Sequence, residues 1–209
     1  MDKSKLTVAV MMAAYQKMGY PLTDESKGFN PNLCGIRNSD INSNSFNDLI
    51  VLWSPSGFIQ VFDATTDPGT FWRLHPMNVE GTGILCTGYY KACFTRGLHQ
   101  GKYKALVQKS AVSFYRDNNK DAKIDRKKET LKKGIVGMNL HHAGINSILV
   151  DKWSAMCQVM ANHYTNRPGF DKPVLDFDYF MGLAEKMAIN NGDKFDYCLF
   201  LEKEVFTAE

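Results

Sequence analysis

Residues 137–144 read GMNLHHAG and residues 150–159 read VDKWSAMCQV, and the rest of the chain is interpreted around these two segments. They place His141 16 residues before Cys157, with Ser154 three residues ahead of that cysteine. The alternation of apolar residues over 135–141 predicts a strand with His141 on the face opposite the apolar side chains. Residues 144–147 have the composition of a turn, after which the chain returns to Cys157 at the start of a second apolar stretch. A strand, a loop and a returning segment can bring the histidine and the cysteine together.

A histidine near a cysteine can support thiol chemistry, because the imidazole accepts the thiol proton and the thiolate is the reactive form. The alternative is a buried structural cysteine beside a hydrogen-bonded histidine, which is the commoner situation for an arbitrary pair. The spacing, together with the serine before the cysteine, favours the reactive interpretation.

This pattern resembles the active-site motif of the L,D-transpeptidase (YkuD-type) family, in which His-Gly on a strand is followed by a loop and then Ser-x-Gly-Cys-x-Arg. His141, Ser154 and Cys157 fall on that motif. The resemblance implies that Cys157 is the nucleophile, that His141 is the base and that Ser154 shapes the turn of the nucleophile.

The chain departs from the family motif at two places. Met156 stands where the family has glycine, a residue that allows a positive φ and a close backbone approach at the oxyanion pocket. We expect methionine there to impair or abolish catalysis, and to strain the turn if the turn needs a positive φ. Gln158 and Val159 replace the segment that carries the family's arginine, so we expect an amide to serve where a guanidinium could bind a substrate carboxylate.

A wider resemblance links the chain to a little-characterised group of bacteriophage and bacterial proteins. It rests on residues 35–37, 46–48, 65–69, 115–119 and 151–154. In that group the residue after the first histidine is usually arginine, which identifies His141 rather than His142 as the motif histidine. The residues expected to contact substrate are Asn139, His142, Trp153, Gln158 and His99.

The expected fold class is α+β and mostly β: a YkuD-like β-sandwich or barrel with an N-terminal helix and a C-terminal helix followed by a strand. With 209 residues and 44% hydrophobic content, the chain can bury one core, so we expect a single domain. Residues 1–47 would form a helix and a turn-rich lead-in, and residues 48–209 the catalytic-like β core.

Several elements can be placed from local signals. We expect a helix over 4–18, a hairpin of 49–53 with 58–62, and strands over 83–87, 103–108 and 112–115. A loop bracketed by glycines is expected at 97–101, a helix beginning at Asp176 and ending at Gly192, and a last strand over 195–201.

Asp117, Asn119, Asp121 and Asp125 stand at positions 1, 3, 5 and 9 of an EF-hand-like loop, which makes a structural Ca²⁺ site conceivable. Ala122 replaces the turn glycine and Lys128 the bidentate acid. A polar turn is therefore favoured over calcium, and no cofactor is expected to be required.

Composition limits the possible partners and compartments. A net charge of +3 is too balanced to indicate nucleic-acid binding, and no run of 18 apolar residues predicts a membrane span. Five cysteines without a CxxC pair suggest reduced thiols and synthesis in the cytoplasm without a clear signal peptide. Action at the cell wall would need help from a phage holin or a virion, and the oligomeric state stays open.

Three functions are compatible with these observations. The first is a cysteine-dependent acyl-transfer enzyme acting on peptidoglycan stem peptides, as an L,D-carboxypeptidase, endopeptidase or transpeptidase, with phage lysis or a virion as its setting. The second is a catalytically inactive phage structural or binding protein that retains the fold, with Met156 as its mark. The third is a cysteine peptidase of another fold, in which Asp67 or Asp151 would orient the base.

Overall fold

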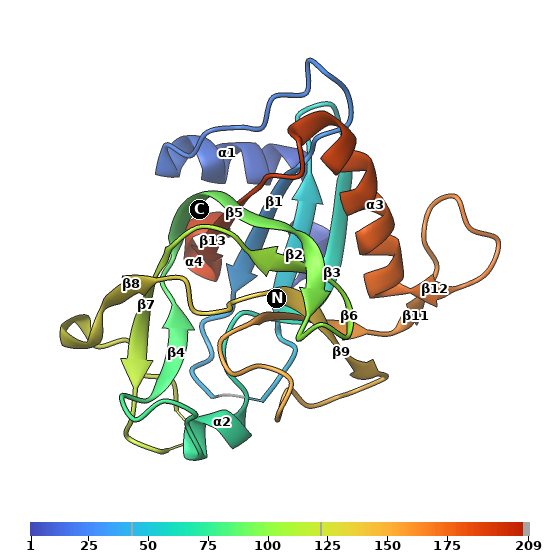
Figure 1. Ribbon diagram of the computed structural model, residues 1–209. Coiled ribbons are helices and arrows are strands. Elements are labelled where there is room, and N and C mark those ends of the chain that lie inside the picture. Colours follow the sequence, from blue (N-terminus) through green and yellow to red (C-terminus); the bar gives the residue numbers. More distant parts are fainter. Residues whose placement is uncertain (43, 122, 207–209) are drawn as a thin grey trace.

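Eight strands close into a barrel in the computed structural model, which describes residues 1–42, 44–121 and 123–206. The strand order around the barrel is β1-β13-β5-β6-β9-β10-β3-β2 (Figure 1). The strands are β1 Asn32–Arg37, β2 Asp48–Trp53, β3 Ile59–Thr65, β5 Gly88–His99, β6 Tyr103–Gln108, β9 Leu140–Ile145, β10 Gln158–Asn162 and β13 Phe195–Leu201. Two of the pairs are parallel, β1 with β13 and β9 with β10. The prediction of a mostly β, α+β chain with a barrel-like sheet is confirmed.

The remaining elements cover the barrel. A three-stranded sheet and α2 lie together below it in Figure 1, α3 lies along one side and α1 crosses the opposite end. The sheet contains β4 Thr82–Leu85, β7 Val112–Asp117 and β8 Lys132–Gly134, and a small ribbon contains β11 Tyr164–Thr165 and β12 Val174–Leu175. The helices are α1 Val8–Met18, α2 Thr70–Leu74, α3 Asp176–Asn191 and α4 Glu202–Val205, with 3₁₀ turns η1 Lys3–Lys5 and η2 Lys128–Thr130.

The apolar run of β2 is continuous because both faces of this strand are buried. Ile50 and Leu52 pack into the core shared with α3, whereas Leu49, Val51 and Trp53 pack into a second core under α1. Successive side chains point to opposite faces of a strand, so a strand covered on both faces needs apolar residues at every position.

Elements with strong local signals are confirmed. The hairpin is β2–β3, and the last strand matches the expected bounds. The helix expected over 4–18 is α1, which begins later, at Val8, because the hydroxyl of Thr7 accepts a hydrogen bond from the Val10 amide. It is capped at its C-terminal end by Gly19, with φ of 65°. Helix α3 ends at Gly192 as expected, although Leu175 rather than Asp176 is its N-cap residue.

The strand expected over 135–141 is wrong, since β9 begins only at Leu140. The side-chain carbonyl of Gln108 accepts hydrogen bonds from the amides of Val136 and Met138, both at 2.9 Å, and Gly137 has φ of 73°. A distant side chain thus takes the place of a neighbouring strand and holds this segment out of the sheet.

The glycine-bracketed loop at 97–101 is also wrong in part. Strand β5, which local signals did not predict, continues through Gly97 to His99, and the turn covers 100–102 with φ of 50° at Gln100 and 71° at Gly101. From the expected lead-in, β1 enters the barrel between β13 and β2. Each of these strands pairs with a neighbour on both sides, β1 with β13 and β2, and β5 with β13 and β6.

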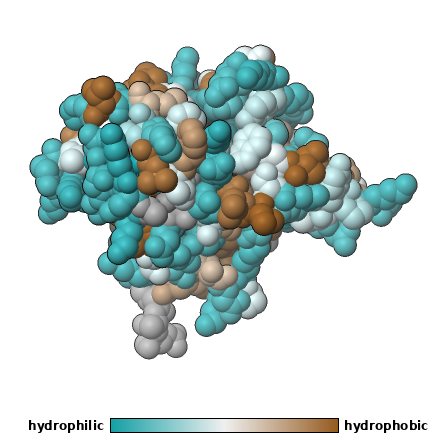
Figure 2. All heavy atoms as spheres, turned by 90° about the horizontal axis from the view of Figure 1, so that it is seen from below, coloured by the Kyte–Doolittle hydropathy of each residue, from teal (hydrophilic) through white to brown (hydrophobic). Residues whose placement is uncertain are grey.

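The surface on the side of α2 is largely hydrophilic, with separate apolar patches (Figure 2). Scattered exposed apolar side chains of this kind are normal for a folded domain. Within the described residues, the helices all fall short of the length and apolarity that a bilayer-crossing helix needs.

Candidate active site

A cavity of about 590 Å³ opens where β5 ends and where the segments leading into β9 and β10 meet. It is lined by the end of β5, by residues that precede β9 and β10, by β4 and β7, and by residues in and after α2. Both His99 and Cys157 belong to this lining. A volume of this size suits a small organic ligand or part of a peptide.

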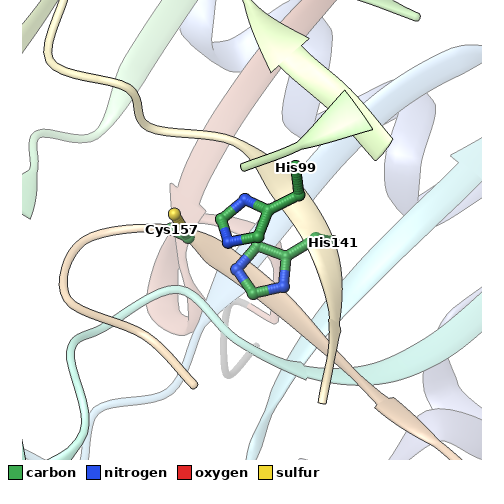
Figure 3. Close-up of side chains that lie close together, drawn as sticks. All are labelled: His99, His141 and Cys157. Carbon is green, nitrogen blue, oxygen red and sulfur yellow. The ribbon is translucent and has the colours of Figure 1, made fainter. Parts of the chain in front are cut away.

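His141 and Cys157 approach each other because β9 and β10 are neighbouring parallel strands. Val159 pairs with His141, so Cys157 lies just before the start of β10, beside the start of β9. One ring nitrogen of His99, one ring nitrogen of His141 and the sulfur of Cys157 all lie within 4.8 Å of one another (Figure 3). The three side chains come from β5, β9 and the loop before β10.

The tautomer of His141 follows from its hydrogen bonds. Its ring is 1% exposed, and Nδ1 lies 3.0 Å from the main-chain carbonyl of His142. A carbonyl only accepts, so we assign the hydrogen to Nδ1, with the oxygen of the Tyr103 hydroxyl, 3.1 Å from the same nitrogen, as a second acceptor. Nε2 therefore holds a lone pair, and it is buried without a hydrogen-bond partner among the described residues. In Figure 3 one ring nitrogen of His141 lies on the side nearest Cys157.

His99 has the opposite tautomer. The main-chain amide of Gln108 donates to Oδ1 of Asn139 at 3.0 Å, which identifies Nδ2 of Asn139 as the donor end of its side chain. This Nδ2 group lies 3.1 Å from Nδ1 of His99 and donates to it. The hydrogen of a neutral His99 must then be on Nε2. One imidazole thus offers a base, and the other a hydrogen-bond donor.

The two rings are stacked, with centroids 3.9 Å apart and planes 24° apart. A metal ion would need a lone pair from each ring converging at about 2.0–2.1 Å. Nearly parallel rings do not converge at that distance, and His99 carries a hydrogen at Nε2. The arrangement of His99, His141 and Cys157 therefore favours acid–base chemistry over metal binding.

Burial keeps both partners of the pair neutral. It lowers the pKa of His141 to about 3, with the neighbouring His99 ring adding to the effect. It raises the pKa of Cys157 to about 11, opposed by a hydrogen bond from the Asn139 main chain. The thiol of Cys157 points its hydrogen at the Gly137 carbonyl, 3.7 Å away. At neutral pH the site thus holds a thiol and a neutral imidazole.

Ser154 shapes the turn that presents the nucleophile. Ser154 is fully buried, and its hydroxyl donates to the Cys157 carbonyl at 2.8 Å. The main-chain carbonyl of Ser154 accepts a hydrogen bond from the Gly69 amide at 2.9 Å. The main-chain amides of Ala155, Met156 and Cys157 donate to no acceptor in the part of the chain that the structure describes, and all three residues line the cavity. Such free amides can stabilise an oxyanion that forms on a carbonyl attacked by Cys157.

The expectation that Met156 strains this turn is wrong. Met156 is not among the described residues with positive φ, so its backbone is one that a side chain tolerates. Its side chain is 8% exposed and packs on Gly83 of β4, where a Cβ atom would collide with the Met156 sulfur. Methionine at this position fills the space that the missing side chain of Gly83 leaves.

Replacing Met156 with alanine should lower the free energy of unfolding by about 2–4 kcal/mol, because the variant loses buried contacts and leaves a cavity over Gly83. Urea denaturation monitored by circular dichroism measures the change. Met77→Ala is the matched control, since Met77 is 74% exposed. A loss for Met156→Ala no larger than that of the control would contradict the packing described above.

Of the residues expected to contact substrate, Asn139, Trp153 and His99 line the cavity, whereas Gln158 and His142 do not. Gln158 is fully buried and accepts a hydrogen bond from the Tyr197 hydroxyl at 2.8 Å. The His142 ring lies over Phe177 of α3, 4.9 Å between centroids, and lines a separate pocket. Strand alternation explains both corrections, since each residue follows a site residue and points to the other face.

The expected calcium ligands have partners within the chain. Asp117 forms an ion pair with Arg73 at 3.0 Å, and the Asn119 amide donates to Asp121 at 3.0 Å and Asp125 at 2.9 Å. Ala122, which bears on this expectation, lies outside the described residues. Calcium binding stays an untested prediction, and these contacts fit the polar turn.

The third hypothesis required an aspartate to orient the base. Asp67 instead forms ion pairs with Arg37 at 3.2 Å and Arg126 at 2.9 Å, and the group that orients His141 is the His142 carbonyl. Sequence reasoning missed this carbonyl, and it also missed Gln108 and Arg116. A main-chain carbonyl has no signature in a sequence, and the other two come from strands distant from the motif. No protein-family model, curated protein or solved structure matches this chain.

Proposed function

We propose that this protein is a cysteine-dependent acyl-transfer enzyme with a YkuD-like fold that acts on peptidoglycan stem peptides. The observation that carries the proposal is the unpartnered Nε2 lone pair of His141, held beside Cys157 at the wall of an open cavity. The choice of a stem peptide comes from the motif resemblance, and the chemistry comes from the geometry. The protein would act at the cell wall or in a virion.

The residues define a sequence of steps. Nε2 of His141 takes the Cys157 thiol proton as the sulfur attacks a peptide carbonyl, and the amides of 155–157 stabilise the oxyanion. The C–N bond then breaks, the leaving amine takes the proton from His141, and a thioester remains on Cys157. Water or an amine then attacks the thioester and regenerates the thiol. Nε2–H of His99 can donate to the sulfur while negative charge develops on it.

The inactive-protein alternative depended on Met156 as a mark of lost catalysis. Because Met156 has an ordinary backbone conformation, that position supplies no strain that would disable the turn. The acyl-transfer proposal is therefore the one we carry forward.

The direct test is to detect the acyl-enzyme. Incubation with purified peptidoglycan fragments, followed by acid quenching and mass spectrometry, should show a mass adduct on the peptide that contains Cys157. Hydroxylamine should remove it, because it cleaves thioesters, and added EDTA should leave it unchanged. An adduct on Cys86 instead, or products formed by Cys157→Ala, would contradict the mechanism.

A further inference from the structure

The charges around the Cys157 cavity have one sign. Among the described residues that line it, Arg116 and Lys152 are the charged side chains with cationic groups, and no carboxylate belongs to the lining. The remaining polar side chains there are amides, a hydroxyl and His99. A concave site with cations and no anions concentrates negatively charged ligands.

Arg116 lies beside the nucleophile's turn through its position in the small sheet. Arg116 of β7 pairs with Gly83 of β4. Paired residues point to the same face of a sheet, so the Arg116 side chain lies on the face to which a side chain at position 83 would point. That face is covered by Met156, the residue before Cys157. Arg116 is thereby placed on the part of the cavity wall that Met156 covers, and Cys157 belongs to the same cavity.

The guanidinium is held in place but not neutralised. Nη1 donates to the Gly81 carbonyl at 2.9 Å, and the Phe114 ring lies 4.9 Å from the guanidinium carbon. Nε is buried without an acceptor, and Nη2 has none in the described part of the chain. Glu80, whose charge raises the pKa of Arg116 against the effect of burial, is paired with Lys132 at 2.7 Å. No described carboxylate forms an ion pair with Arg116.

Lys152 contributes a second positive charge. Its ammonium lies 4.4 Å from the centre of the Phe71 ring, a cation–π contact that holds it at the cavity without removing its charge. Arg116 is only partly buried, and its donors that lack an acceptor in the chain can pair with acceptors that a ligand supplies. A planar carboxylate matches such donors better than any other common anionic group on a peptide.

We propose that this cavity selects acyl donors that carry a free carboxylate, which Arg116 binds and Lys152 attracts. Resting on the proposed acyl transfer, the inference specifies its substrate as a peptide with an ionised carboxyl group near the attacked carbonyl. Arg116, on β7, then supplies a guanidinium in place of the arginine that the resembling family carries shortly after its cysteine.

A pair of alkylating reagents tests this without a substrate. Iodoacetate and iodoacetamide have nearly the same size, and only the first carries a carboxylate; the Cys157 thiolate displaces iodide from either. The quantity measured is the ratio of their rates at Cys157, obtained by peptide mass spectrometry. Arg116→Gln should lower this ratio about tenfold, because one charge-assisted hydrogen bond is lost. Lys152→Gln should lower it less, about threefold, because its contact with the anion is through space.

The controls separate charge from folding. Arg96→Gln removes an arginine that pairs with Asp193 outside the cavity, and it should leave the ratio as in the wild type. Arg116→Lys keeps the charge and should recover most of the ratio. Cys34 is fully buried, so its labelling marks an unfolded variant, and Lys152→Gln decides the outcome if Arg116→Gln is unfolded. Raising the salt concentration should lower the wild-type ratio, since screening weakens the attraction.

A ratio that stays within about twofold of the wild-type value in folded Arg116→Gln, or in Lys152→Gln where Arg116→Gln is unfolded, would overturn the inference. The result is independent of the proposed function. A protein that forms no thioester with peptidoglycan fragments can still prefer iodoacetate, and an active enzyme can lack this preference. The two failures are therefore distinguishable.

Discussion

Cys157→Ala should lower the rate of stem-peptide conversion by about 10⁴-fold or more, and His141→Gln should lower it by about 10³-fold. The first change removes the atom that forms the thioester. The second leaves the thiol without a base, and with its pKa raised to about 11 the thiol supplies little thiolate at neutral pH. Product formation from peptidoglycan fragments, followed by liquid chromatography with mass spectrometry, measures both rates.

The double variant should be no slower than Cys157→Ala, because the two residues act as a unit and their effects do not add. Cys86→Ala and His163→Gln are matched controls that replace the same residue types away from the cavity lining, and they should retain activity. Cys157→Ala that retained a tenth or more of the wild-type rate would exclude the covalent mechanism. A wild-type protein without activity would favour the alternative, a catalytically inactive structural or binding protein.

Acidification should destabilise the protein through His141. Its pKa is about 3 in the folded chain against an ordinary value of 6.5, so above pH 6.5 it is neutral in both states and contributes no pH dependence. Between pH 6.5 and about 3 the unfolded chain binds a proton that the folded chain does not, and the free energy of unfolding falls. At about 1.4 kcal/mol per pH unit, the full loss approaches about 5 kcal/mol.

The measurement compares His141→Gln with the wild type by urea denaturation at pH 7 and pH 4.5. Between these two values the wild type should lose about 3 kcal/mol more than the variant, which has no imidazole at this position. Burial and Asp67 raise the pKa of Asp48 to about 6, which has the opposite pH dependence, and this contribution is common to both proteins. Equal losses in the two proteins would show that His141 is not buried in its neutral form.

The sequence by itself determined the elements whose signals lie within a few residues. The β2–β3 hairpin has a turn sequence between two apolar runs, and α3 presents its apolar face at helical spacing. Cys157, His141 and Ser154 were identified because a motif is a local pattern. Their assembly was inferable, because a strand, a loop and a returning strand leave few alternatives for the chain.

The tertiary structure alone decided what depends on distant partners. Gln108 holds 135–139 out of the sheet, and through Asn139 it sets the tautomer of His99. Barrel closure places β1 and β5 between neighbours that their own sequences do not specify. Hydrogen-bond donors and acceptors are chosen by geometry across strands, and the same residue can donate, accept or remain buried without a partner. For this reason the residue types at the site could be predicted from the sequence, whereas the lone pair at His141 and the uncompensated charge of Arg116 could be found only in the folded chain.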